Sequence, residues 1–208
     1  MPRDEWTIPR VIARRRRADP QVQAIVSDEG AITWAELDHA SRAVASCLVR
    51  AGLKKGDRVG LLMPNGAEWA TVALAVMRVG AVLVPLSTLL QPPELLAQLR
   101  LAAVDQLITV RAYRGRSYLD DLASLAPALV DRIGGGQRDP VLPALRRIWT
   151  WGELPDAPVA TSLIDALEDV VRPADDMVIL FTSGSRGAPK GVIHLISPLS
   201  MSKAVIRL

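Results

Sequence analysis

Three continuous apolar runs restrict this chain to a layered α/β fold. The runs cover residues 59–63, 81–86 and 177–181, and none of them alternates between apolar and polar side chains. A strand without such alternation is typically covered on both faces, as strands of parallel sheets are. Residues 67–79, between the first two runs, are almost wholly apolar and predict a helix that Gly80 ends. This strand–helix–strand unit predicts a parallel sheet with a right-handed crossover.

Further elements are expected on both sides of this unit. Thr33 and Glu36 have the spacing of a capping box, which predicts a helix that Gly52 terminates. Helices are also predicted over 7–17 and 92–103, a hairpin over 22–33 and a strand over 106–110. Residues 111–175 carry weaker patterns, namely helices near 118–125 and 163–171 and a strand near 147–151. The predicted fold class is α/β, with layers around largely parallel buried strands.

Composition narrows the possible functions. With 50% hydrophobic residues in 208, the chain can bury a sizeable core. The net charge of +3 is dispersed except at Arg14 to Arg17, which we interpret as a solvated helix face, so no nucleic-acid partner is predicted. Cys47 is the only cysteine, which excludes an intrachain disulfide. His39 and His194 are too far apart in the sequence to suggest a metal site, and none is predicted.

The location of the protein is predicted from two features that are not found in the sequence, a signal peptide and a membrane-spanning segment. No segment has the pattern of a signal peptide, and the longest charge-free stretch, residues 79–93, is too short and too rich in proline and glycine to cross a membrane. We therefore predict a cytoplasmic protein without a membrane span.

A glycine-rich and hydroxyl-rich loop follows the last apolar run. Residues 181–191 read FTSGSRGAPKG and offer backbone N–H groups, hydroxyls and a lysine to an anion. A Walker A loop requires glycine where Pro189 stands and a hydroxyl residue where Gly191 stands. The glycine spacing of a dinucleotide-binding loop is also absent. The loop therefore predicts phosphate binding by a different motif.

This loop resembles the signature of the adenylate-forming enzymes, the superfamily of acyl-CoA synthetases, peptide-synthetase adenylation domains and luciferases. The family form is Tyr/Phe-Thr-Ser-Gly-Thr/Ser-Thr-Gly-x-Pro-Lys-Gly-Val, and Arg186 is the clear departure from it. Residues 32–37, 55–59, 64–69 and 80–86 resemble N-terminal landmarks of acyl-CoA synthetases in their usual order. The resemblance covers roughly residues 5–194.

The resemblance implies ATP-dependent adenylation of a carboxylic acid, fatty or aryl, followed by thioester formation with coenzyme A. It also implies that the loop wraps the β- and γ-phosphates of ATP, which acts with magnesium. The glycine backbones would approach the phosphates, the hydroxyls would donate hydrogen bonds, and the lysine would neutralise the leaving pyrophosphate. The nucleotide-binding residues predicted in this way are Thr182, Ser183, Gly184, Ser185, Arg186, Gly187 and Lys190.

The resemblance also implies motifs that this sequence does not contain. A Tyr-Gly-x-Thr-Glu segment, a Thr-Gly-Asp segment and a C-terminal lysine are expected after the loop. We therefore predict an incomplete N-terminal AMP-binding domain over 1–194 and a divergent tail over 195–208, for which a frameshift or a gene split is our hypothesis. No catalytic residue and no coenzyme A site are assigned, and the chain alone is expected to be inactive.

Two alternatives to an acyl-CoA synthetase component stay open. The chain could be a non-catalytic module that binds a nucleotide or a partner, or one piece of a split enzyme. In this family several buried strands pair with strands from later in the chain, which predicts exposed sheet edges. The expected partner is accordingly a complementary polypeptide or a second copy of the chain.

Overall fold

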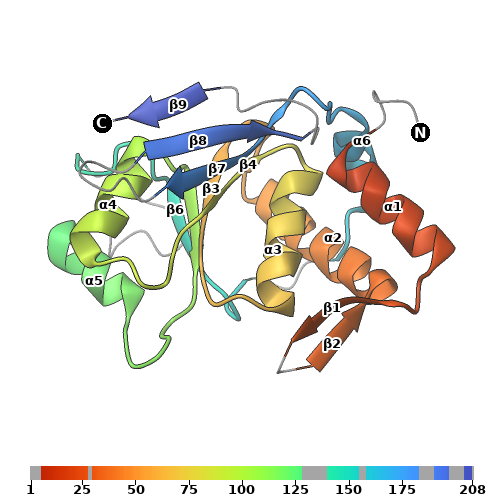
Figure 1. The fold of residues 1–208 in the computed structure, drawn as a ribbon, viewed down its shortest axis with the longest axis horizontal. Helices are drawn as coiled ribbons and strands as arrows, with labels where there is room; N and C mark the ends of the chain where they lie inside the picture. The colour runs from red at the N-terminus through yellow and green to blue at the C-terminus, as the bar shows by residue number, and fades with distance from the viewer. Residues whose placement is uncertain are drawn as a thin grey trace.

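A mostly parallel sheet forms the centre of the molecule. The computed structural model describes residues 6–27, 30–127, 140–154, 158–182, 190–196 and 204–207. Within this part, seven strands pair in the order β6-β5-β3-β4-β7-β8-β9 (Figure 1). The five strands from β6 to β7 run parallel, and β8 and β9 are antiparallel additions. Their bounds are β3 Arg58–Leu62, β4 Val82–Pro85, β5 Gln106–Thr109, β6 Arg147–Thr150, β7 Asp176–Thr182, β8 Lys190–Leu195 and β9 Ala204–Arg207.

Helices cover both faces of this sheet, as the continuous apolar runs predict. On one face α2 (Trp34–Arg50), α3 (Ala67–Arg78) and α6 (Thr161–Asp169) pack on a core that contains Leu61, Leu83 and Val178. On the other face α4 (Pro92–Leu101) and α5 (Tyr118–Leu125) pack on Leu62 and Ile179. Figure 1 shows α1 (Ile8–Ala18) on the side of α2 and α3, above a separate hairpin of β1 (Gln23–Ser27) and β2 (Gly30–Thr33). The predicted α/β fold class is therefore confirmed.

Most predicted elements are confirmed, with differences at their ends. The capping box of α2 forms as predicted, because Glu36 N donates to the hydroxyl of Thr33 and Thr33 N donates to the carboxylate of Glu36. Helix α6 begins and ends two residues earlier than predicted. Thr7 occupies the N-cap of α1, but its hydroxyl forms no capping hydrogen bond. No strand was predicted at the positions of β8 and β9.

A buried ion cluster joins three helices of the α1-side layer. Arg78, whose side chain is 1% exposed, donates to Asp38 Oδ1 at 2.8 Å and to Ser41 Oγ at 2.9 Å. Its guanidinium also pairs with Glu168 of α6. Arg42 of α2 binds the same glutamate at 3.2 Å. Asp38 and Ser41 are therefore buried together with Leu37 and Leu48 of α2, because both polar side chains find partners inside the layer.

Candidate functional site

Thr182 and Lys190, the first and last of the predicted phosphate-binding residues, lie on the hairpin that β7 and β8 form. These strands pair in antiparallel register from Thr182 opposite Lys190 to Asp176 opposite Leu195, with one irregularity near Asp176. Thr182 and Lys190 therefore stand opposite each other where the loop of residues 183–189 leaves the sheet. The other predicted residues, which are Ser183, Gly184, Ser185, Arg186 and Gly187, lie outside the described residues.

The two described site residues share one face of the hairpin. Residues that are directly opposite in an antiparallel pair point to the same side. Thr182 and Lys190 are both exposed, and no carboxylate among the described residues pairs with Lys190. A hydroxyl donor and an ammonium group thus lie together at the base of the loop, which is a suitable pair for an anionic ligand.

The opposite face of the hairpin is anchored in the core. Ile179 and Ile193, which pair with each other, are buried in the cluster beneath α4 and α5, and Phe181 packs against it. Phe181 is paired with Gly191, and a Cβ atom at position 191 would lie 3.4 Å from its ring and 3.1 Å from Ile179 Cγ2. The absence of a side chain at Gly191 therefore leaves room for Ile179 and the Phe181 ring on this face of the hairpin.

The sheet topology places Thr182 and Lys190, which flank the loop, at the edge where ligands bind in open α/β folds. The connection after β3 passes through α3 on one face, and the connection after β4 passes through α4 on the other. Adjacent strands whose connections leave toward opposite faces form a topological switch point, and ligands bind outside the carboxyl ends of the strands there. Strand β7 is the next neighbour of β4 and runs parallel to it, so the loop leaves the same edge.

Other titratable groups lie elsewhere and have structural partners. Asp175, at the opposite end of β7, accepts from Arg172 N at 2.7 Å and pairs with Lys55 at 2.6 Å. Burial raises the pKa of the Cys47 thiol, which keeps it neutral as a core side chain. Across the described ranges, no group of three or more histidines, cysteines or acids could hold a metal ion.

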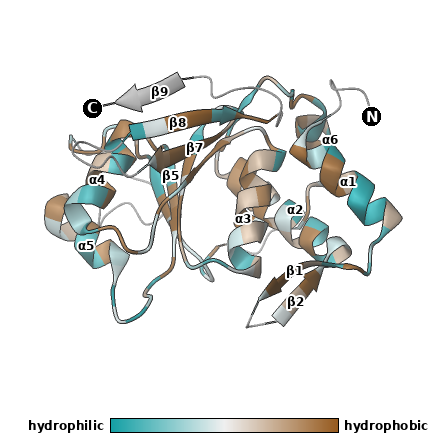
Figure 2. Cartoon of the chain, viewed as in Figure 1, coloured by the Kyte–Doolittle hydropathy of each residue, from teal (hydrophilic) through white to brown (hydrophobic). Residues whose placement is uncertain are grey.

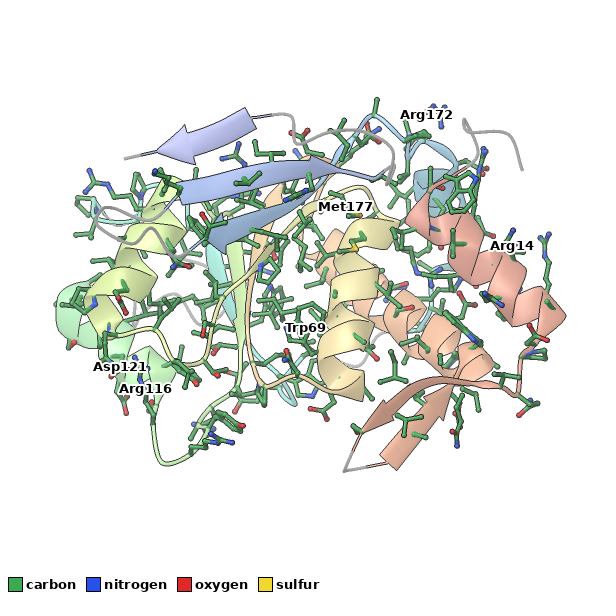
Figure 3. The ribbon with its side chains drawn as sticks, in the orientation of Figure 1. Arg14, Trp69, Arg116, Asp121, Arg172 and Met177 are labelled. Atoms are coloured by element: carbon green, nitrogen blue, oxygen red, sulfur yellow. The ribbon has the colours of Figure 1, made fainter. Side chains whose placement is uncertain are left out.

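The arginine run of α1 lies mainly at the surface. Arg14, Arg15, Arg16 and Arg17 are all exposed, and Figure 3 shows Arg14 on the outer side of the helix. Arg15 pairs with Asp19 at 3.9 Å, and Arg16 pairs with Asp38 at 3.2 Å. The prediction of a solvated helix face agrees with these positions. Within the part of the chain that the structure describes, no helix is long and apolar enough to cross a membrane.

Sequence comparison identifies a family and individual proteins that are similar to this chain. The profile of the AMP-binding enzyme family matches residues 12–204. YngI of Bacillus subtilis, an acyl-CoA synthetase by its description, is 35% identical over 202 residues, which are 90% of this chain and 37% of YngI. The long-chain-fatty-acid–CoA ligase FadD13 of Mycobacterium tuberculosis is 30% identical over 195 residues, which are 88% of this chain and 34% of FadD13. The chain therefore spans about a third of the length of these curated relatives.

Solved structures show the same fold. The inhibitor-bound N-terminal domain of FACL13 from Mycobacterium tuberculosis superimposes with a TM-score of 0.68 at 26% identity, over 91% of this chain and 44% of that domain. The anthranilate CoA ligase AuaEII, solved with anthranoyl-AMP, gives a TM-score of 0.71 at 23% identity over 93% of this chain and 35% of its own. The chain corresponds to the N-terminal part of the adenylate-forming fold, as predicted.

Proposed function

Because this chain belongs to the family of AMP-binding enzymes, we propose that the loop between β7 and β8 binds the phosphates of ATP. The observation that carries the proposal is the pair of exposed side chains at the base of the loop, Thr182 and Lys190, at the carboxyl edge of the parallel sheet. The sequence motif supplies the other members of the proposed site, which are Ser183, Gly184, Ser185, Arg186 and Gly187.

In this proposal each group has a separate role. The Lys190 ammonium is a compact charge on a flexible stem, and it compensates the negative charge of the terminal phosphates. Thr182 donates a hydroxyl hydrogen bond, and glycine at 184 and 187 permits the backbone N–H groups to approach phosphate oxygens. Magnesium is proposed as the partner ion of ATP, as the family resemblance implies.

The activity that we propose for the complete enzyme is acyl-CoA ligation with ATP and coenzyme A, on a fatty or aryl acid. The relatives support this class, since they include a medium-chain fatty-acid–CoA ligase of Escherichia coli and a feruloyl-CoA synthase of Amycolatopsis. We propose that the 208 residues alone do not complete the reaction, because they span about a third of such ligases. The boundary at residue 194 and the cytoplasmic location stay predictions.

Nucleotide-dependent thermal stabilisation tests the phosphate site. A ligand that binds only the folded chain raises its melting temperature. We expect ATP to stabilise the wild-type chain and Lys190→Ala to bind ATP about tenfold more weakly or worse, because a charge-assisted hydrogen bond is lost. Lys54→Ala is the matched control, since Lys54 is an exposed lysine just before the amino end of β3. Equal stabilisation of Lys190→Ala and the wild type would remove Lys190 from the site.

A second experiment separates an enzyme from a nucleotide-binding module. The purified chain is incubated with ATP, magnesium, labelled pyrophosphate and a panel of carboxylic acids. We expect ATP binding without pyrophosphate exchange. Exchange that depends on an added acid would show that these 208 residues carry out adenylation by themselves.

A further inference from the structure

Strand β8 has a strand neighbour on each side at the base of the loop of residues 183–189. It pairs with β7 on one side, and on the other side it pairs with β9 from Lys190 to Ile193. Figure 1 shows β9 along the outer edge of β8. In this register Lys190 stands between Thr182 of β7 and Arg207 of β9. The backbone at the start of β8 is therefore held from both sides.

The edge of β8 that β9 covers belongs to an apolar strand. Val192 is half-buried, Ile193 is 9% exposed, and Figure 2 shows the hydrophobic colour in the middle of β8. An apolar strand with an unpaired edge offers free N–H and C=O groups to other chains and favours aggregation. Strand β9 is suited to the outer position, since it has only four residues and its sequence places Lys203 and Arg207 around three apolar residues.

The start of β8 needs a second neighbour because its second residue is a glycine. Gly191 leaves room for Ile179 of β7, but glycine loses more conformational freedom on folding than other residues and weakens a strand. Strand β9 places Ile206 opposite Gly191, and residues with branched Cβ atoms favour the strand conformation. Pairing with β9 therefore supports β8 at the residue next to Lys190.

Family membership does not supply this strand. The profile of the AMP-binding enzymes matches the chain up to residue 204, whereas β9 covers Ala204–Arg207. Val205, Ile206 and Arg207 therefore lie beyond the match. Strand β9 is a feature of this chain that neither the family nor the apolar pattern of the sequence predicts.

We propose that β9 is a positioning strand for the phosphate site. Its backbone pairing holds the first residues of β8, so that the ammonium group of Lys190 stays at the base of the loop for the negative charge of a nucleotide triphosphate. The same pairing closes the edge of β8 with a segment of this chain itself. The role given to Lys190 rests on the proposed function, whereas the pairing of β9 with β8 does not.

Two proline variants of the full chain test the pairing. Consecutive residues of an antiparallel strand direct their N–H groups to opposite sides, so only one of Val205 and Ile206 donates to β8. Val205→Pro and Ile206→Pro each remove one N–H group, but only one of them removes a hydrogen bond between the strands. The other variant is the matched control. Backbone hydrogen exchange, resolved for each residue of β8 and recorded without nucleotide, compares the two.

We expect one proline variant to accelerate exchange at least about tenfold at alternate amides of β8, and the other to stay close to the wild type. The acceleration alternates because the amides of β8 that face β7 keep their acceptors, and these amides are an internal control. Equal exchange in the two proline variants would overturn the pairing of β9. The same acceleration at every amide of β8 would also overturn it.

A double-mutant comparison tests the positioning of Lys190. The proline variant that breaks the pairing is expected to bind ATP about tenfold more weakly, measured by the thermal shift over a series of ATP concentrations. In the Lys190→Ala background the same proline should have little further effect, because β9 acts through this lysine. Equal losses in both backgrounds would overturn the positioning role. Unchanged ATP binding by Lys190→Ala would reject the proposed function and the positioning role with it, while alternating exchange in β8 would still support β9 as the closing strand.

Discussion

At the scale of single residues, the pairing of Phe181 with Gly191 explains how the hairpin presents the loop. The ring of Phe181 occupies the space next to Gly191, since a Cβ there would lie 3.1 Å from Ile179 Cγ2. Contacts of that length force the neighbouring side chains to move, and overpacking of this kind destabilises proteins. Glycine at position 191 therefore permits the close packing of β7 against β8 next to Lys190.

We expect Gly191→Ala to lower the free energy of unfolding by about 1–2 kcal/mol and to weaken ATP binding. The methyl group has to displace Ile179 or the Phe181 ring, which shifts the strand that carries Lys190. Urea denaturation and the ATP-dependent thermal shift measure the two effects. Gly66→Ser is the control, because a Cβ at Gly66 would have no neighbour within 4 Å and serine remains a favoured N-cap residue for α3. If Gly191→Ala matched this control in stability, the packing argument would fail.

The site residues differ in how far the sequence could predict them. The motif gave Thr182 and Lys190 as binding residues, and their pairing across β7 and β8 brings them together. Arg78 lies in the last turn of the helix predicted over residues 67–79, and the structure shows that it is the centre of a buried cluster. Sequence spacing cannot show this, because its partner Glu168 belongs to a helix far away in the chain and no local pattern connects the two.

At the scale of elements, helix α2 shows which local signals are sufficient for prediction. Thr33 and Glu36 satisfy each other's backbone N–H groups, so the first turn of the helix is closed by residues that are close in the sequence. Strand β8 lacked such a signal. Its sequence, KGVIHL, begins inside the glycine-rich motif, and its strand conformation depends on pairing with β7. Local chemistry therefore predicted helix starts better than it predicted added strands.

Removal of the cap should destabilise α2. We expect Thr33→Ala to cost about 1 kcal/mol of folding free energy, because the N–H of Glu36 loses its acceptor. Thermal unfolding followed by circular dichroism measures the change. Ser27→Ala is the control, since the Ser27 hydroxyl bonds only within the β1–β2 turn. A loss in Ser27→Ala as large as in Thr33→Ala would argue against a specific capping effect.

The capping box of Thr33 and Glu36 also predicts that the stability of the fold depends on pH. Two hydrogen bonds from Thr33 lower the pKa of Glu36. The bond from the backbone N–H has the larger effect, and the bond from the hydroxyl has the smaller one. A carboxyl whose pKa is lower in the folded state stabilises the fold above its unfolded pKa, and it loses this effect as the pH falls through the folded pKa. Wild type should therefore exceed Glu36→Gln in stability at neutral pH and approach it in acid. A constant difference across acidic and neutral pH would contradict this assignment.

At the scale of the whole molecule, the order of the strands could not be predicted from the sequence. The apolar runs predicted parallel strands, but they do not state that β7 lies beside β4 while β5 and β6 lie on the far side of β3. That order depends on which faces the helices cover. It places Thr182 and Lys190, which flank the glycine-rich loop, at the carboxyl edge of the sheet, near the switch point between β3 and β4. The arrangement of the candidate site is therefore a property of the assembled sheet.

The ion cluster around Arg78 joins the helices of one layer to each other. It joins α2 and α3, from the first half of the chain, to α6, which directly precedes β7 in the element order. Asp38 and Glu168 have side chains only 10% and 12% exposed, so each carboxylate depends on a nearby guanidinium. Removal of one partner from such a cluster leaves charge that water cannot fully solvate.

We expect Arg78→Met to lower the free energy of unfolding by about 3 kcal/mol or more, measured by urea denaturation. Arg111→Met is the matched control and should change little, because Arg111 is 76% exposed in its pair with Glu153. The double variant Arg78→Met, Glu168→Leu should regain part of the loss, since the carboxylate left without its partner is removed as well. If Arg78→Met were as stable as Arg111→Met, Arg42 and Arg16 would be sufficient for both carboxylates, and the docking of α6 would depend on its apolar contacts alone.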